Sequence, residues 1–162
     1  MQIGTEKIED SNILIEKTIR KYADMIFKLA FQYTGDEYDA QDILQEVGVA
    51  LVTANPPYEN ETHLRNWLCR VTINKCRNLN KYKKIRLCEE LDENLCSFDN
   101  TLSLSEELAR LPQKYRIVLY LYYYDEYSIE EISKILRLNK NTVGSQLRRG
   151  REKLKKILSE GE

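Results

Sequence analysis

Apolar residues in the first fifty positions recur at steps of three and four, which is the spacing of amphipathic helices. Such a stripe predicts a first helix from Ser11 to Thr34, and Gly35 suits its C-terminal end because glycine accepts a positive φ. Asp36 can cap a second helix that runs to about Ala54, where the double proline at 56–57 ends it. The inward residues of the first helix are Ile15, Ile19, Tyr22, Ile26, Leu29, Ala30 and Tyr33.

A third helix is predicted from Thr62 into the eighties, and three such helices make a small all-α domain. Trp67 is assigned to the core rather than to base stacking, because it shares a stripe with Leu64 and Leu68. The stretch 84–105 is acidic and weakly periodic, which predicts a linker. The inward residues of the third helix are Leu64, Trp67, Leu68, Val71 and Leu79.

A second helical unit is predicted from about Ser105, with Pro112 in the first turn of a helix that carries Ile117, Val118 and Leu121 inward. Three tyrosines at 122–124 spread round that helix. Aromatic rings can also form a stacking platform for bases, but core packing explains the run more simply.

A helix-turn-helix follows at the expected spacing. Ser128 and Glu131 match a capping box, and the helix that they begin extends through Leu136. Arg137 and Leu138 form a tight turn, and Asn139 caps the next helix. The inward residues are Ile129, Ile132 and Ile135 or Leu136 in the first helix, and Val143, Leu147, Leu154 and Ile157 or Leu158 in the second.

Charge is distributed in blocks although the formal net charge is only −1. Residues 62–88 hold eight Lys or Arg and no acid, residues 89–107 hold seven acids and no base, and residues 133–158 hold nine bases and one acid. Two basic blocks around an acidic stretch indicate two surfaces that face nucleic acid. Two solvated helix faces are the simpler alternative for either block alone.

The second helix of the helix-turn-helix is the predicted reader of double-stranded DNA. In a major groove, the N-terminal residues of such a helix meet base edges, and the flanking Lys and Arg meet phosphates. An ordinary helical hairpin with a basic outer face is the alternative. The candidate DNA-binding residues are Lys140, Asn141, Thr142, Ser145, Gln146, Arg148, Arg149 and Arg151.

The sequence contains no spacing of residues that is typical of a metal site or of a catalytic site. The four cysteines lack a C-x2-C pair, and His63 is the only histidine, so no metal or cofactor is expected. No hydrolase triad or Gly-rich phosphate loop is visible, which predicts a protein that is not an enzyme. No apolar run is long enough to span a membrane, and the N-terminus does not resemble a signal peptide, so a cytoplasmic protein is expected.

Three motifs in order resemble bacterial sigma factors, specifically the small extracytoplasmic-function (ECF) group. They are TGDEYDAQDILQEV at 34–47, LRNWLCRVTINKCRNLNKYKK at 64–84, and the segment from Leu111 to Leu158 that contains the helix-turn-helix. The chain departs from the family pattern in four places. Gly48 replaces a usual Phe, Arg137 a usual turn Gly, Gly144 a common Lys and Gln146 a common Arg.

The resemblance implies two small helical domains: a region 2-like domain at 8–86, an acidic linker at 87–105 and a region 4-like helix-turn-helix domain at 106–160. It implies a subunit that binds core RNA polymerase and directs promoter recognition, DNA melting and transcription initiation. Promoter DNA is then a partner, and an anti-sigma factor, often membrane-anchored in this group, is another. No small-molecule substrate is implied.

The resemblance also assigns residues to two surfaces of the first domain. An acidic and amide face suits the clamp helices of polymerase, and amides and basic residues suit the −10 element. Asn74 can alternatively brace the helices against each other. The core-polymerase residues are Asp39, Asp42, Ile43, Gln45 and Glu46, and the −10 residues are Tyr58, Asn60, Arg65, Asn66, Arg70, Asn74, Lys75, Arg77, Asn78 and Lys81.

Two other classes of protein remain open at this stage. One is a stand-alone helix-turn-helix transcriptional regulator with an N-terminal helical interaction domain, which has no need of the motif at 34–47. The other is an inhibitory protein that imitates a sigma factor without initiating transcription.

Overall fold

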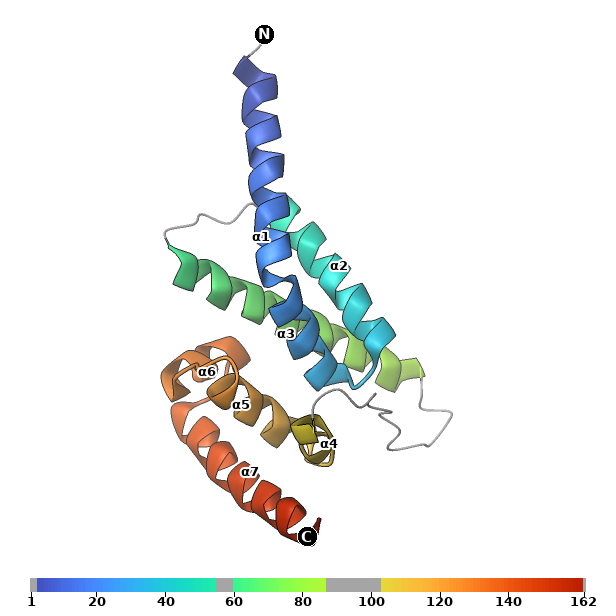
Figure 1. Ribbon diagram of the computed structural model, residues 1–162, viewed down its shortest axis with the longest axis vertical. Coiled ribbons are helices and arrows are strands. Elements are labelled where there is room, and N and C mark those ends of the chain that lie inside the picture. Colours follow the sequence, from blue (N-terminus) through green and yellow to red (C-terminus); the bar gives the residue numbers. More distant parts are fainter. Residues whose placement is uncertain (1–2, 55–59, 87–102, 162) are drawn as a thin grey trace.

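The computed structural model describes residues 3–54, 60–86 and 103–161. Within these ranges the chain forms seven α-helices and no strand, which confirms the predicted all-α class. Figure 1 shows two helical groups, α1–α3 in blue to green and α4–α7 in yellow to red. Most of the predicted acidic linker lies outside the described residues.

The first group contains α1 (Ile3–Thr34), α2 (Glu37–Ala54) and α3 (Glu61–Arg86). Gly35 ends α1 with φ 69°, and the Asp36 carboxylate accepts a 3.0 Å hydrogen bond from the Asp39 amide, so both predicted boundary roles are confirmed. Asn60 begins α3 in the same way, since its side-chain oxygen accepts a 2.8 Å hydrogen bond from the His63 amide. α1 begins eight residues earlier than the apolar stripe predicts.

The core of the first group is made where the stripes of the three helices meet. α1 contributes Tyr22, Ile26 and Ala30, which are at most 8% exposed. Trp67 is half-buried and packs against this core, as predicted. The buried residues from the other two helices are Ala40, Ile43, Val47 and Leu51 of α2, and Leu64, Leu68 and Cys76 of α3.

The second group contains α4 (Ser103–Ala109), α5 (Gln113–Tyr123), α6 (Ile129–Leu136) and α7 (Lys140–Glu160). α4 begins inside the segment that was expected to be linker. Pro112 is the N-cap of α5, one position before the helix rather than inside its first turn.

The predicted turn of the helix-turn-helix is confirmed in detail. The capping box of Ser128 and Glu131 is present with both hydrogen bonds, and Asn139 caps α7 through a 2.8 Å bond from the Asn141 amide. Arg137 adopts the left-handed conformation with φ 54°, the conformation that glycine would adopt freely at that position.

Ile117, Val118 and Leu121 of α5 are buried, as are Val143 and Leu147 of α7, in agreement with their predicted inward positions. Leu154 and Ile157 pack partly buried against the same cluster. Ile129 and Leu158 are different: 36% and 45% of their surfaces are exposed, because each lies at the margin of its helix face. The prediction that Ile129 points inward is therefore wrong.

The two groups pack against each other through α1 and α3 on one side and α5 and α6 on the other. Leu29 of α1 and Cys69 and Ile73 of α3 are fully buried and belong to the hydrophobic cluster of the second group rather than the first. This packing makes one body of two helical groups and brings α6 alongside α3.

α1 extends well beyond the other helices at its N-terminal end (Figure 1). Ile13 and Leu14 lie on this extension and are 51% and 54% exposed. None of the helices in the described ranges is long and apolar enough to cross a membrane.

Candidate functional site

α3 carries four rows of side chains at intervals of four residues, and each row has a different neighbour. The first row is buried in the core of the first group, and the second faces α6 and the segment that connects α5 to α6. The third row is polar, and the fourth borders α2. In order, the rows are Leu64, Leu68, Thr72 and Cys76; Arg65, Cys69, Ile73 and Arg77; Asn66, Arg70, Asn74 and Asn78; and Trp67, Val71, Lys75 and Leu79.

The third row brings together four of the residues predicted to bind the −10 element. Three amides and one guanidinium lie on one side of α3, and Asn78 is exposed while the other three are half-exposed. The side-chain oxygen of Asn66 is buried without a hydrogen-bond partner in the described part of the chain. Lys81 is exposed in the next turn. This row can offer both donors and acceptors to unstacked bases.

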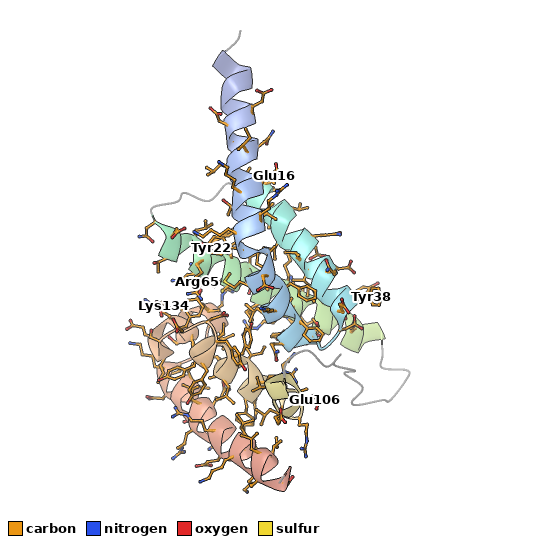
Figure 2. All side chains as sticks on the ribbon, in the orientation of Figure 1. Glu16, Tyr22, Tyr38, Arg65, Glu106 and Lys134 are labelled. Atoms are coloured by element: carbon orange, nitrogen blue, oxygen red, sulfur yellow. The ribbon has the colours of Figure 1, made fainter. Side chains whose placement is uncertain are left out.

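Arg65 lies where the two helical groups meet, as Figure 2 shows. Its Nη2 donates a 2.8 Å hydrogen bond to the main-chain oxygen of Asp125, and the guanidinium lies 4.7 Å from the ring centre of Tyr127. The Asp125 carboxylate is 3.9 Å away, too far for a hydrogen bond. Arg65 is therefore held by the second group rather than left in solvent.

Arg77, at the C-terminal end of the second row of α3, is bound to the second group in a similar way. Its Nη2 donates a 2.7 Å hydrogen bond to the main-chain oxygen of Leu136, the last residue of α6. Carbonyl groups at a helix C-terminus lack intrahelical partners and carry a partial negative charge, so a guanidinium stabilises that end. The same guanidinium lies near Tyr33, where its charge partly offsets the rise in the pKa of the phenol that burial causes.

Asp125 and Cys69 form the buried centre of this contact. Burial raises the pKa of the Asp125 carboxyl to about 6, and the nearby charges of Arg65 and Lys28 only partly oppose that rise. The Cys69 sulfur lies 3.3 Å from the Tyr127 hydroxyl, and burial raises the pKa of the thiol to about 12. Burial raises the pKa of Cys76 to about 12 as well.

The outer face of α2 forms the second candidate surface. Asp42, Gln45 and Glu46 are all exposed, and they line a shallow hollow of about 540 Å³. Glu46 lies 3.8 Å from Lys75 of α3, so Lys75 borders this hollow instead of joining the polar row. The remaining residues of the hollow are Val49, Ala50 and Thr53.

Two of the residues predicted to contact polymerase are placed differently. Ile43 is 2% exposed and packs in the core of the first group, so its assignment as a direct contact is wrong for this arrangement. Asp39 forms an ion pair with Lys83 of α3, and its side chain is only 17% exposed. Ile43 supports the surface from beneath, because apolar residues on an amphipathic helix pack inward.

One residue of this surface, Val49, was missed from the sequence, as was the exposure of Val52 farther along α2. Val49 and Val52 of α2 are 65% and 54% exposed, and Val49 lines the hollow beside the acidic residues. The exposure of both valines could have been predicted from the sequence, since both lie off the inward stripe that contains Val47 and Leu51.

Two −10 candidates precede α3. Tyr58 lies outside the described residues. Asn60 is exposed, and its side-chain oxygen is engaged as the N-cap of α3.

The outer face of α7 carries the candidate major-groove residues. Asn141, Thr142, Arg148 and Arg149 are exposed, and Ser145 is half-exposed between them. The remaining candidates lie at the borders of this face. Lys140 lies 3.5 Å from the Glu130 carboxylate, Gln146 has a buried side-chain oxygen without a partner in the described residues, and Arg151 lies about 6 Å from the rings of Tyr122 and Tyr123.

Comparison with known protein families matches both helical groups. The family model described as "Sigma-70 region 2" matches residues 18–84, which include the C-terminal half of α1, all of α2 and most of α3. The model described as "Sigma-70, region 4" matches residues 101–154, from α4 into α7. The two matches occur in this order along one chain.

Whole-length relatives are similar as well. The ECF RNA polymerase sigma factor SigW of Bacillus subtilis is 29% identical over 158 residues, with 85% of this chain and 84% of SigW covered. The RNA polymerase sigma factor SigV of the same organism is 26% identical over 150 residues, with 89% and 90% covered.

Among solved structures, the sigma factor RpoE of Bartonella quintana in complex with the anti-sigma factor NepR has a similar fold. Its TM-score is 0.73 at 15% identity, and 95% of this chain and 98% of RpoE are covered. CnrH in complex with the cytosolic domain of CnrY gives a TM-score of 0.64 at 21% identity, with 91% and 89% covered.

Proposed function

Because this chain belongs to the sigma-70 family, as an RNA polymerase sigma factor of the ECF group, we propose that it binds core RNA polymerase and directs it to promoters. The observation that carries this proposal is the succession of a region 2 match and a region 4 match in one chain. A stand-alone helix-turn-helix regulator accounts for the second match and leaves the first unexplained.

The division of labour follows the two helical groups. Residues 8–86 form the domain that binds core polymerase and the −10 element, residues 87–105 link the domains, and residues 106–160 form the domain that binds the −35 element. Support for this comes from the polar row of α3 and from the exposed basic face of α7, which lie on different groups.

The α2 hollow is the proposed docking site for polymerase. Asp42, Gln45 and Glu46 offer carboxylates and an amide to a basic partner, and Val49 supplies apolar surface to bury. Complementary charge speeds encounter and fixes the register of the contact, while buried apolar surface stabilises it.

The polar row of α3 is the proposed site for the melted −10 strand. Amide groups of Asn66, Asn74 and Asn78 can hydrogen-bond base edges that become accessible only when the duplex is open. Arg70 and Lys81 would neutralise phosphates of the same strand. Because those contacts need unpaired bases, binding at this row favours melted DNA over the duplex.

The outer face of α7 is the proposed reader of the −35 element. Its N-terminal residues Asn141 and Thr142 would meet base edges in the major groove, and Arg148 and Arg149 would contact the flanking phosphates. Gly144 lies within this face and has open space around it, so it supplies no side-chain contact to a base.

The protein acts, in this proposal, as a cytoplasmic subunit without catalytic activity of its own, because the reaction belongs to polymerase. An anti-sigma factor is proposed as a further partner. The two solved structures of similar fold support that partner, since both contain a sigma factor or its relative bound to another protein.

Purified chain mixed with core RNA polymerase tests the proposal. We expect a stable complex in size-exclusion chromatography, and specific transcript starts when the complex is given genomic DNA. A stand-alone regulator would elute apart from polymerase. An inhibitory imitator would co-elute but produce no transcripts.

A further inference from the structure

Asp39 of α2 and Lys83 of α3 form an ion pair that ties the beginning of one helix to the end of the other. Asp39 lies in the first turn of α2, and Lys83 lies in the last turn of α3. A carboxylate is favourable at a helix N-terminus and an ammonium group at a helix C-terminus, so each charge also stabilises its own helix. The pair therefore stabilises both helix ends as well as the contact between them.

The turn that precedes Asp39 is fixed by local hydrogen bonds. The Gly35 amide donates a 2.8 Å bond to the Phe31 carbonyl, which closes the end of α1. The Asp36 carboxylate accepts a 3.0 Å bond from the Asp39 amide, which caps the start of α2. The backbone on both sides of this corner is thus constrained, and the Asp39 carboxylate is a fixed point for a partner on α3.

The C-terminal end of α3 lacks buried side chains that would hold it in place. No side chain from Arg77 to Lys83 is buried, and Tyr82 is 60% exposed. A helix end without a buried apolar face opens locally at a low cost in free energy. The ion pair lies about two turns beyond the fully buried Cys76, so it has a large influence on whether this end stays helical.

These last turns complete the polar row proposed to bind the −10 strand. Asn78 is the last amide of the row, and Lys81 is exposed in the next turn. Side chains two residues apart on a helix do not face each other, so Lys83 can bind α2 while Lys81 points away from it. The ion pair thus holds the inner side of the helix and leaves the DNA-facing side free.

A second ion pair joins the same two helices but leaves its acid accessible. Glu46 lies 3.8 Å from Lys75, and their side chains are 59% and 36% exposed. Glu46 also lines the α2 hollow, where a basic partner can reach it. Asp39 does not line that hollow, and its side chain is only 17% exposed. Asp39 is therefore placed to hold α3 and not to contact polymerase.

We propose, on the basis of the function given above, that Asp39 is a positioning residue for the −10 strand. Through Lys83 it fixes the last turns of α3, so that Asn78 and Lys81 stay aligned with the rest of the polar row. Asp39 then belongs to the support of the DNA surface instead of the polymerase surface to which sequence resemblance assigned it. Lys83, which Asp39 neutralises, is not a phosphate contact.

A double-mutant cycle in the full chain tests this arrangement. Asp39→Asn and Lys83→Gln each remove one charge and keep a polar side chain. We expect each single variant, and the double variant as well, to bind a mixed-sequence 20-nucleotide single strand about fivefold more weakly than the natural chain. The two changes should not add, because either one breaks the same contact. Fluorescence anisotropy measures the affinity.

The sign of the Asp39→Asn effect separates positioning from simple electrostatics. Removing a carboxylate removes repulsion, so on charge alone this variant would bind phosphates more tightly. Weaker binding therefore reports the loss of positioning. If Lys83 contacted a phosphate itself, Lys83→Gln would reduce the salt slope of binding by about 0.7, whereas we expect an unchanged slope.

Hydrogen exchange shows where the change lies. We expect the amides at 79–83 to exchange about fivefold faster in all three variants, while the amides at 64–76 keep their natural rates. If both segments exchange faster in Asp39→Asn, that variant has lost global stability, and Lys83→Gln decides the matter. Co-elution with core polymerase should be unchanged in all three variants.

Glu37→Gln is the matched control, because it removes the other carboxylate from the first turn of α2 at an exposed position. It should change neither strand binding nor the exchange rates at 79–83.

Two results would overturn the role given to Asp39. One is an Asp39→Asn variant that binds the single strand as tightly as the natural chain or more tightly. The other is an Asp39→Asn variant that no longer co-elutes with polymerase while its strand binding is natural, which would return Asp39 to the polymerase surface. A natural chain that binds neither polymerase nor the strand would refute the proposed function together with this role.

Discussion

Gly150 of α7 packs directly against Leu119 of α5. A Cβ atom at position 150 would lie 3.1 Å from Leu119 Cδ1 and 3.3 Å from Tyr115 Cβ, which is closer than ordinary van der Waals contact. Leu119 is 2% exposed and Tyr115 is 6% exposed, so neither side chain has free space to move into. Helix α7 can approach α5 this closely because residue 150 has no side chain.

Gly150→Ala should therefore destabilise the chain by about 1–3 kcal/mol, as overpacking does in a dense core. Urea unfolding followed by circular dichroism measures the change. Gly144→Ala is the matched control: nothing lies within 4 Å of the added methyl group, and alanine should stabilise the helix by up to about 1 kcal/mol. Two variants that shift in the same direction would contradict the close packing.

Ser128→Ala removes the side chain that accepts a hydrogen bond from the Glu131 amide at the start of α6. The expected loss of stability is about 0.5–2 kcal/mol, because one N-terminal amide of the helix is left without its partner. Thermal unfolding is the measurement. Glu131→Gln keeps a side chain that can reach back to the Ser128 amide, so it should cost much less.

Reversing the charge of Asp42 and Glu46 to Lys should abolish co-elution with core polymerase. Glu46 has one exposed ion pair with Lys75, and pairs of this kind contribute roughly 0–1 kcal/mol, so the fold should survive. Glu16→Lys with Asp24→Lys makes the same charge change on exposed positions of α1 and should leave the complex intact. Unchanged recruitment by the α2 variant would reject the hollow as the docking site.

The Asp125 carboxyl should make stability depend on pH. Its pKa is about 6 in the folded chain against an ordinary 3.8, so the folded chain binds more protons between these values. Stability then decreases as pH rises from about 4 through 6, by up to about 3 kcal/mol.

Asp125→Asn removes this titration. The difference in unfolding free energy between the natural chain and the variant, measured in urea from pH 4 to 7, should therefore move in the variant's favour as pH rises. If the unfolding free energies of the natural chain and the variant ran parallel against pH across that range, the raised pKa of the buried Asp125 carboxyl would be contradicted.

Arg149→Ala should weaken binding to duplex DNA that contains the −35 element and reduce the salt slope of binding by about 0.9, because one phosphate contact is lost. Fluorescence anisotropy at several salt concentrations gives both values. Arg110→Ala removes a charge from an exposed ion pair with Glu160, outside the α7 face, and should leave the slope unchanged.

The elements of the fold were predictable because local chemistry specifies them. The cap at Asp36, the positive φ at Gly35 and the capping box at Ser128 each depend on neighbours within four residues, and the structure has all three. The start of α1 was not predictable in this way. Its first turns lie ahead of the apolar stripe, so no periodic signal marks them.

The candidate site was only partly predictable, because one helix can serve two cores. The apolar stripe of Leu64 and Leu68 was visible, and it indicated one buried face of α3. Cys69 and Ile73 form a second, shorter stripe whose partner lies more than fifty residues away in sequence. Residue type identified Arg65 as a cation but could not show that a distant carbonyl binds it.

Four side-chain donors join the two groups by hydrogen bonds to main-chain oxygens, and no substitution deletes a main-chain oxygen. Heritable loss of this packing is therefore expected mainly at the donors and among the apolar residues between them. Arg65 and Arg77 are also proposed promoter contacts, so selection for promoter use would preserve the packing of the two groups through the same two codons.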